Sequence, residues 1–278
     1  LTCSPSRGAA RRRPGTIAVT AHLDSVGFIV EEVHEDHVKV LPMGGPSARA
    51  YTPMVIESAG GILPGTLLVQ GEGKERTLLI DLWDKEAMSR VRVGDLAAFG
   101  PNFRVERGRV HSRWLDNKLG LWVALEAWRE TDDALFVATV REEHGPPGAG
   151  AVALRHPELD LALVVDITYS ASPEGPYIIS WGEGPALTLR DNSILDRRWV
   201  QAVARVAAAH EMPVQMEIAT SGGSDARHLA MFGVPSVFVG VPIRYAHTPA
   251  EVARLDDCEA AKTLLVRAVE AFNAGSLR

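Results

Sequence analysis

The sequence predicts an α/β protein with a largely parallel sheet covered by helices on both faces, and a small β domain inserted into it. After residue 109, apolar strands alternate with segments of helix length, a pattern typical of parallel sheets. Residues 31–108 instead hold short apolar runs separated by Gly and Pro, which favours a small barrel-like domain. The length of 278 residues and a hydrophobic fraction of 46% suffice for both units. We therefore assign residues 1–30 and 109–278 to one discontinuous domain and residues 31–108 to the insert.

Composition narrows the functional classes. A net charge of -6 gives no basic surplus for binding nucleic acid or an anionic membrane surface. No apolar run reaches the roughly 18 residues of a membrane span, and the basic N-terminus, with Arg11–Arg13 expected in a solvated loop, has no apolar core of a signal peptide. Cys3 and Cys258 form no disulfide framework, which fits a reduced, cytoplasmic setting.

The first predicted strand, residues 16–21, leads directly into His22-Leu23-Asp24. In an extended chain, residues two apart share a face, so His22 and Asp24 should point the same way. An imidazole with a carboxylate beside it is the usual arrangement of a metal ligand and the acid that orients it. A lone His-x-Asp is nevertheless weak evidence.

The insert is expected to follow from residue 31, with one short helical piece near residues 84–90. Its apolar run at residues 54–56 should not face solvent without a partner, so we expect a homo-oligomer that forms through this domain. The α/β pattern then resumes with a helix over residues 119–128. Asp116 lies just before this helix, where N-capping alone would explain an acid.

Two adjacent carboxylates, Glu142 and Glu143, follow a buried strand at residues 135–140. Neighbouring side chains of an extended chain point to opposite faces, so the two should have different roles. The rest of the chain alternates regularly. The further strands are expected at 161–165, 185–189, 214–219 and 234–241, the last of the chain, and the helices at 148–154, 196–210, 226–232 and 255–272.

Six residues with ligand or acid–base chemistry fall at or just after the ends of predicted strands: His22, Asp116, Glu142, Glu143, Asp166 and His247. Such ends meet at one edge of an α/β sheet. Imidazoles with carboxylates suit zinc, cobalt or manganese. The charges of Asp116, Glu143 and Asp166 balance two divalent ions and one bridging hydroxide, which leaves Glu142 as a base. A two-metal hydrolase is the natural chemistry.

In their order along the chain, six motifs resemble the M42 family of glutamyl and deblocking aminopeptidases, some members of which carry an endoglucanase label. The motifs are Ala21–Phe28, Leu115–Lys118, Arg141–Gly145, Asp166–Thr168, Gly222–Ala226 and Ile243–Thr248. The resemblance runs from about Thr16 to the end of the chain. It implies a zinc-peptidase-like, three-layer α/β/α fold with an inserted β domain, and assembly into large shells, often dodecamers.

The resemblance also implies residue roles. His22 and Asp166 would hold one metal, Glu143 and His247 the other, and Asp116 would bridge the two. Glu142 would be the general base, with Asp24 orienting the site, in an aminopeptidase that removes N-terminal residues from peptides.

The chain departs from the family pattern in several places. Ser25 stands where Glu is usual, Lys118 where Arg is common, Pro147 where a basic residue is usual, and Ser224 where Thr is usual. The segment before the first metal His is also short. None of the implied ligands is lost, so these departures bear on substrate preference and on oligomer contacts.

Three alternative functions are compared with the aminopeptidase: a glycosidase, a dimetal deacylase and a shell-forming homologue. A glycosidase needs two carboxyl groups roughly 5–9 Å apart across a sugar bond, which adjacent Glu142 and Glu143 do not offer, and it would resist chelators. A dimetal deacylase could use the same ligands, and acyl-blocked substrates would distinguish it. A shell-forming homologue without turnover is the non-enzyme alternative. The sequence leaves the preferred N-terminal residue open.

Overall fold

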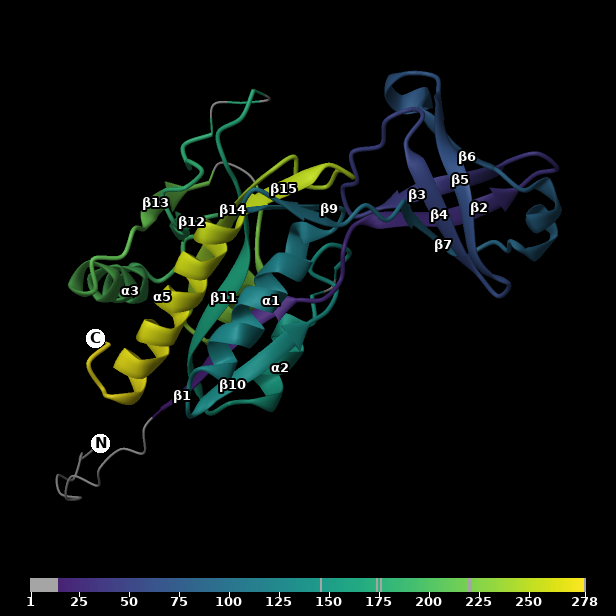
Figure 1. Cartoon of the computed structure of the whole chain (residues 1–278). Helices are drawn as coiled ribbons and strands as arrows, with labels where there is room; N and C mark the ends of the chain where they lie inside the picture. The colour runs from purple at the N-terminus through teal and green to yellow at the C-terminus, as the bar shows by residue number, and fades with distance from the viewer. Residues whose placement is uncertain (1–14, 146, 174, 176, 220–221, 278) are drawn as a thin grey trace.

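The computed structural model describes residues 15–145, 147–173, 175, 177–219 and 222–277. A large α/β domain and a separate small β barrel lie side by side, joined by two crossings of the chain (Figure 1). No helix in these ranges is long and apolar enough to cross a membrane. Cys3 and Arg11–Arg13, on which the composition argument drew, lie outside the described residues.

The large domain is built on a mixed sheet, nine-stranded within the described ranges. Its strands are β1 (Thr16–His22), β8 (Arg104–Glu106), β9 (Arg109–Ser112), β10 (Ala134–Thr139), β11 (Leu159–Tyr169), β12 (Ala186–Arg190), β13 (Gln215–Ile218), β14 (Ser236–Arg244) and β15 (Glu251–Arg254). The strand order is β10-β1-β11-β14-β15-β9-β8, with β12 also paired to β14 and β13 to β12. Strands β10, β1, β11 and β14 run parallel, whereas β15, β9, β8 and β12 join through antiparallel pairs.

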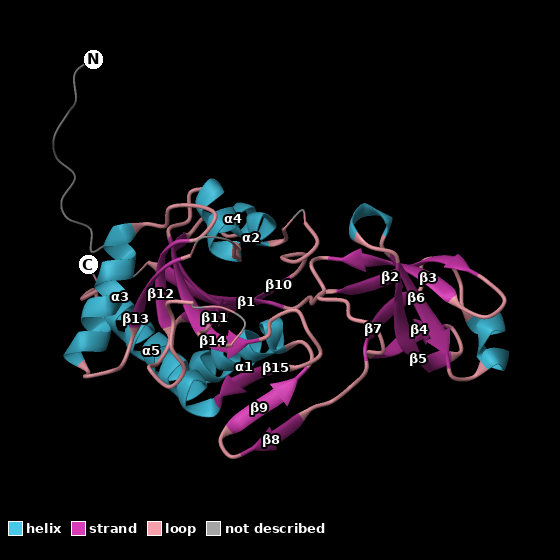
Figure 2. Cartoon of the chain, turned by 90° about the horizontal axis from the view of Figure 1, so that it is seen from above, coloured by secondary structure: helices cyan, strands magenta, loops and turns pink. Residues whose placement is uncertain are grey.

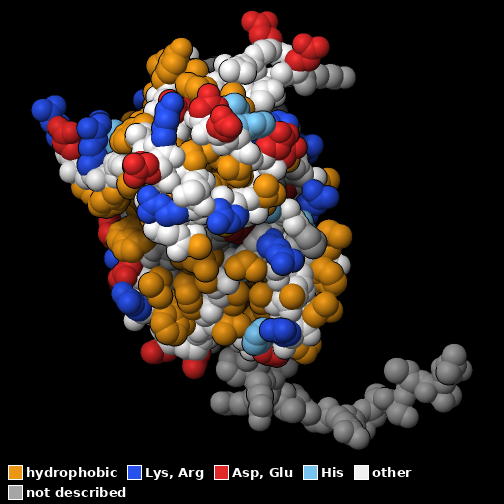
Figure 3. Space-filling view, turned by 90° about the vertical axis from the view of Figure 1, so that its right-hand side faces the viewer, with side chains coloured by type: hydrophobic (Ala, Val, Ile, Leu, Met, Phe, Trp, Pro, Cys, Tyr) orange, Lys and Arg blue, Asp and Glu red, His pale blue; other side chains and the backbone are white. Residues whose placement is uncertain are grey.

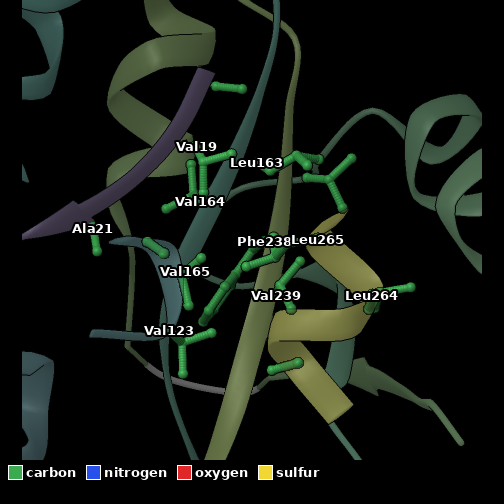
Figure 4. Packing of buried hydrophobic residues seen from close by; sticks show 14 of the residues in the cluster. Val19, Ala21, Val123, Leu163, Val164, Val165, Phe238, Val239, Leu264 and Leu265 are labelled. Atoms are coloured by element: carbon green, nitrogen blue, oxygen red, sulfur yellow. The ribbon is translucent and has the colours of Figure 1, made fainter. Parts of the chain in front are cut away.

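Helices lie on both faces of this sheet (Figure 2). They are α1 (Leu115–Arg129), α2 (Ala149–Arg155), α3 (Arg197–Ala209), α4 (Asp225–Met231) and α5 (Leu255–Asn273). α1 and α5 pack together on one face, α2 and α4 pack together on the other, and α3 packs against β12 and α5. Figure 4 shows β-branched and Leu side chains of β1, β11 and β14 packed against Val123 of α1 and Leu264 and Leu265 of α5. This core holds the parallel strands rigidly, so that their carboxyl ends are fixed relative to one another.

The antiparallel edge differs from the expectation. The strand predicted as the last of the chain is followed by β15, which pairs with β9, and the β8–β9 hairpin belongs to the large sheet. These strands span only three or four residues each. Strands this short carry too little apolar periodicity to be recognised, and they form because a non-local partner satisfies their backbone groups.

The insert is a closed antiparallel barrel of order β2-β3-β6-β5-β4-β7. Its strands are β2 (Gly27–Val33), β3 (Val38–Met43), β4 (Pro53–Ser58), β5 (Gly61–Gln70), β6 (Thr77–Leu82) and β7 (Leu96–Phe99), with short 3-10 turns η1 (Gly73–Glu75) and η2 (Lys85–Arg90). The barrel strands thus begin four residues before the predicted boundary. Phe28 and Val30 alternate into the barrel core with Phe99, which places β2 there and not in the large domain.

The apolar run at residues 54–56 does not form a surface patch. Met54 and Ile56 are 1% and 0% exposed and belong to the barrel core. The alternation of a half-buried strand explains this arrangement, because residues two apart share the inner face. The expectation that this run itself would be exposed was wrong.

Candidate active site

Three predicted ligands gather at the carboxyl end of β1. His22 is the last residue of β1, Asp116 lies at the start of α1, and Asp166 lies within β11, three residues before its end. His22 Nε2 is 3.3 Å from Asp116 Oδ1 and 3.4 Å from Asp166 Oδ1. All three side chains are buried. One donor atom from each lies within 4.8 Å of the others, a spacing that a single cation can bridge.

A second triplet shares Asp116 with the first. His247 Nε2 is 3.2 Å from Asp116 Oδ2 and 3.5 Å from Glu143 Oε1. The donor atoms of this triplet also lie within 4.8 Å of one another. The two oxygens of Asp116 therefore face two different imidazoles, and the carboxylate stands between two candidate cation sites.

Glu142 and Glu143 lie in a turn, not in the extended strand that the sequence suggested. β10 ends at Thr139, and Arg141 has a φ of +65°. Asp24 holds this turn: its Oδ1 accepts the backbone N–H of Glu142 at 3.2 Å, and its Oδ2 accepts that of Glu143 at 3.1 Å. The two side chains are thus separated by an anchored turn and not by strand alternation.

Asp24 also lies beside His22. His22 Nδ1 is 3.7 Å from Asp24 Oδ1 and 3.2 Å from the Asp24 backbone oxygen. One acid therefore contacts the imidazole of the first triplet and the backbone that carries Glu143 of the second. A side chain so placed orients both sets of donors without joining either.

Glu251, which sequence reasoning missed, ties the second triplet together. Its Oε1 accepts the backbone N–H of His247 at 2.8 Å, and its Oε2 accepts that of Asp116 at 3.1 Å. It is 1% exposed, and burial, followed by the negative charge of Asp116, raises the pKa of its carboxyl to about 8. Its only sequence signal was an acid four residues after His247, on the strand β15 that was not expected.

The barrel contributes a loop to this site. The backbone oxygen of Gly45 lies 3.2 Å from His247 Nδ1, and Ser47 donates its N–H to the His247 backbone oxygen at 2.8 Å. A Cβ on Gly45 would come within 3.3 Å of that ring nitrogen, so the bare backbone permits the approach. The Gly-Gly-Pro stretch had signalled a turn only.

Two departures from the family pattern meet in space. Lys118 Nζ donates to Ser25 Oγ at 3.3 Å and also to the backbone oxygen of Leu23. Ser25 Oγ donates in turn to the backbone oxygen of Asp116 at 3.1 Å. The Ser25–Lys118 pair thereby links the segment that carries Asp24 to the start of α1.

Charge and burial shift the titration of this cluster strongly, as functional sites often do. Burial raises the pKa of Asp116, but the hydrogen bonds from His22 and His247 outweigh it and lower the pKa to about 2. Burial lowers the pKa of His247, yet Asp116 and Glu143 raise it to about 11. For Glu142, burial and the charge of Asp166 raise the pKa to about 9. The cluster holds more negative charge than its protein surroundings compensate, a condition that cations relieve.

The donor set fits divalent transition metals. Each triplet offers one imidazole nitrogen with carboxylate oxygens, the ligands that zinc, cobalt and manganese accept. Glu143 Oε1 is buried and has no hydrogen-bond partner. A buried carboxylate oxygen that accepts no hydrogen bond is costly, and the ion-pair distance of 3.5 Å from Glu143 Oε1 to His247 Nε2 offsets this only in part; a cation between Glu143 and His247 would lower the cost further.

The two triplets open into one cavity of about 200 Å³. Its lining residues are His22, Asp116, Glu142, Glu143, Asp166, Ile167, Thr168, Tyr169, Asp191, Glu217, Ala219, Gly222, Gly223, Phe238 and His247. All the predicted ligands and Glu142 line it, whereas Asp24 is not among its lining residues and contacts His22 and the backbone of Glu142. Asp191 and Glu217 were not expected.

Comparison with known proteins identifies the family of this chain. The model of the M42 glutamyl aminopeptidase family matches residues 6–264. A protein of Acetivibrio thermocellus named as an aminopeptidase is 31% identical over 272 residues, covering 91% of this chain and 82% of its own. An aminopeptidase structure from Desulfurococcus kamchatkensis has a TM-score of 0.84 at 27% identity, over 92% of this chain and 80% of that one.

A further solved structure, the TET1 peptidase of Pyrococcus horikoshii, has a TM-score of 0.78 at 25% identity, over 92% of this chain and 84% of that one. Its title states that it can assemble into a tetrahedron or a large octahedral shell. The two solved structures, named as an aminopeptidase and a peptidase, thus share the fold of this chain over most of its length. The match over most of its length establishes that this chain belongs to the M42 glutamyl aminopeptidase family.

Proposed function

We propose that the protein is a dinuclear metal-dependent aminopeptidase. His22 and Asp166 hold one divalent ion, Glu143 and His247 hold the other, and Asp116 bridges them. The observation that carries this proposal is the position of Asp116, whose two oxygens lie 3.3 and 3.2 Å from the two imidazoles. Zinc or cobalt is expected, and manganese is compatible with the same donors.

When bound, the two ions would supply Lewis-acid polarisation of the scissile carbonyl and activation of a water molecule. The chain's own part is proton transfer and positioning. Glu142 lines the cavity but belongs to neither triplet, so its carboxylate is free to take a proton from water and pass it to the leaving amine. Asp24 holds the turn that presents Glu142 through the hydrogen bond to its backbone N–H.

A free N-terminal amine should be required for rapid cleavage. The carboxylate of Glu142 lies in a cavity rich in negative charge, which favours an incoming ammonium group and places the first peptide bond beside the reacting centre. We expect an N-acetylated peptide to be cleaved about tenfold more slowly, or worse, than its free counterpart. Steady-state rates on a matched pair of peptides in one metal buffer measure this. Equal rates would overturn the aminopeptidase assignment in favour of a deacylase or an endopeptidase.

We further propose a homo-oligomer larger than a dimer, assembled partly through the barrel. Large hydrophobic side chains are exposed on the barrel at Val33, Leu41, Tyr51, Ile62, Trp83, Val93 and Leu96. The side of the molecule where the barrel faces the viewer shows hydrophobic side chains among scattered charges (Figure 3). Burial in an assembly removes such surface from water, and the shells formed by the TET1 peptidase support the same architecture here.

Light scattering at micromolar concentration should therefore give a mass several times that of the 30.0 kDa chain. Ile62→Asp places a charge on the exposed barrel surface and should lower that mass. Leu154→Asp, at an exposed site on α2 of the large domain, is the matched control and should leave it unchanged. A wild-type protein that stays monomeric contradicts the assembly, and equal effects of both variants contradict the role of the barrel.

A further inference from the structure

Two buried carboxylates line the cavity without belonging to either cation triplet. Asp191 is 1% exposed and Glu217 is 6% exposed, and both face the same space as the proposed ligands. Burying a carboxylate is costly unless it is hydrogen-bonded or paired with a cation. The hydrogen bonds that each carboxylate accepts show how far the protein itself compensates for its burial.

Glu217 is held in place by two hydroxyl groups. Thr168 on β11 donates to its Oε1, and Thr188 on β12 donates to its Oε2, both at 2.6 Å. Thr188 is also the strand partner of Glu217 in the parallel β12–β13 pair. A carboxylate has about four acceptor positions, so each oxygen keeps one for a donor inside the cavity. Fixed by two short hydrogen bonds, Glu217 needs little reorganisation to receive a ligand.

Asp191 is fixed in a similar way. Its Oδ1 accepts the backbone N–H of Ser193 at 2.7 Å and the Ser193 hydroxyl at 3.0 Å, and its Oδ2 accepts the Ser224 hydroxyl at 3.1 Å. Ser224 follows Gly222 and Gly223, which line the cavity. Asp191 therefore joins the end of β12 to the turn that forms one side of the cavity.

The charges of the cavity do not balance even with two ions present. Six carboxylates line it, those of Asp116, Glu142, Glu143, Asp166, Asp191 and Glu217. Among its described lining residues there is no Lys or Arg. Two divalent ions offset four of the six formal negative charges. The remaining negative charge lies on the lining of the cavity, where burial strengthens electrostatic attraction to a cation.

We propose that the pocket selects a cationic N-terminal residue, of the lysine or arginine type, and that Glu217 receives its charged end. The assignment rests on the proposed aminopeptidase function. Ile167, Ala219 and Phe238 add apolar surface to the same cavity, against which the aliphatic part of such a side chain packs. Asp191 strengthens the negative potential in the cavity while it keeps its hydrogen bonds from Ser193 and Ser224. An acidic N-terminal residue meets repulsion from both carboxylates.

Lysine and norleucine substrates isolate the charge, because their side chains are similar in length and differ chiefly in the ammonium group. With metal-reconstituted protein and aminoacyl p-nitroanilides, we expect kcat/KM for lysine to exceed that for norleucine by about tenfold or more, as one charge-assisted hydrogen bond provides. The difference should lie mainly in KM. Glutamyl p-nitroanilide should be the poorest of the three.

Glu217→Gln keeps the shape of the side chain and removes its charge, so the lysine-to-norleucine ratio should fall about tenfold. Glu106→Gln, at an exposed site on β8, changes the net charge equally and should leave the ratio unaltered. Asp191→Asn is the second variant, with a smaller fall in the ratio. Competition by L-lysinamide and L-norleucinamide against a leucyl substrate measures binding to the wild-type protein, independently of any variant's folding.

Equal cleavage of lysine and norleucine, with equal competition by the two amides, overturns the selectivity while the aminopeptidase function stands. A Glu217→Gln variant that loses the two activities in equal proportion shows that Glu217 only braces the strands, and overturns its role. If no free aminoacyl substrate is cleaved by fully metallated protein, the proposed function fails and this inference fails with it.

Discussion

Glu142→Gln is expected to slow hydrolysis by about two orders of magnitude or more, the usual scale for loss of a general base, while metal binding is kept. Glu142 lies in the cavity beside both triplets but contributes no donor atom to either. The amide has nearly the shape of the carboxylate but cannot take a proton from water. The kcat on an aminoacyl p-nitroanilide and the metal content by mass spectrometry measure the two halves of this result.

Glu106→Gln, at an exposed site on β8 outside the cavity lining, serves as the control and should retain wild-type kcat. Loss of metal from the Glu142 variant would instead make Glu142 a ligand and Glu143 the candidate base. Retention of both metal and full kcat would remove Glu142 from the mechanism altogether.

Asp116→Ala should abolish activity and lower the metal content from about two equivalents per chain towards zero. Asp116 is the only residue that the two triplets share, and its 6% exposure leaves no room for a water shell to replace it. Without the shared carboxylate, the mutual repulsion of two divalent ions at these sites would also lose the negative charge that would offset it. Equilibrium dialysis against limiting zinc or cobalt measures the loss.

Asp132→Ala, an exposed acid after α1, is the matched control and should bind the ions as the wild type does. Circular dichroism of both metal-free variants establishes that each is folded. A folded Asp116→Ala protein that still binds two ions with wild-type affinity contradicts the bridging role.

The sequence predicted the grouping of the site because parallel strands align their carboxyl ends. His22 at the end of β1 and Asp166 near the end of β11 lie on neighbouring parallel strands, so their closeness follows from this pairing and from the shared direction of the two strands. Asp116 and His247 were also expected there from their places beside predicted strand ends, and the M42 resemblance, which the comparisons confirm, added the role of each residue. The roles assigned to all these residues stay predictions.

What the sequence did not reveal depends on pairings between distant segments. Glu251 reaches the site because β15 pairs with β9 and β14. Gly45 reaches it because a loop of the barrel contacts His247. Glu217 had no motif around it. It reaches the cavity because β13 pairs with β12 in a register that sets it beside Thr188. Local patterns carry no information on such registers.

The turn that carries Glu142 and Glu143 shows a second limit. The apolar run before it predicts a strand, which the structure contains up to Thr139, but strand alternation does not extend to Glu142 and Glu143, three and four residues further on. Arg141, with a φ of +65°, reverses the chain, and the side chain of Asp24 fixes the result. A tertiary hydrogen bond here overrides the local pattern.

The central claim is that one carboxylate bridges two ions, and anomalous X-ray scattering from crystals of the zinc- or cobalt-reconstituted protein tests it most directly. We predict two peaks at the metal's absorption edge, one among His22, Asp116 and Asp166 and one among Asp116, Glu143 and His247, each next to a different oxygen of Asp116. A single peak, or two peaks of which one lies away from Asp116, would contradict the account.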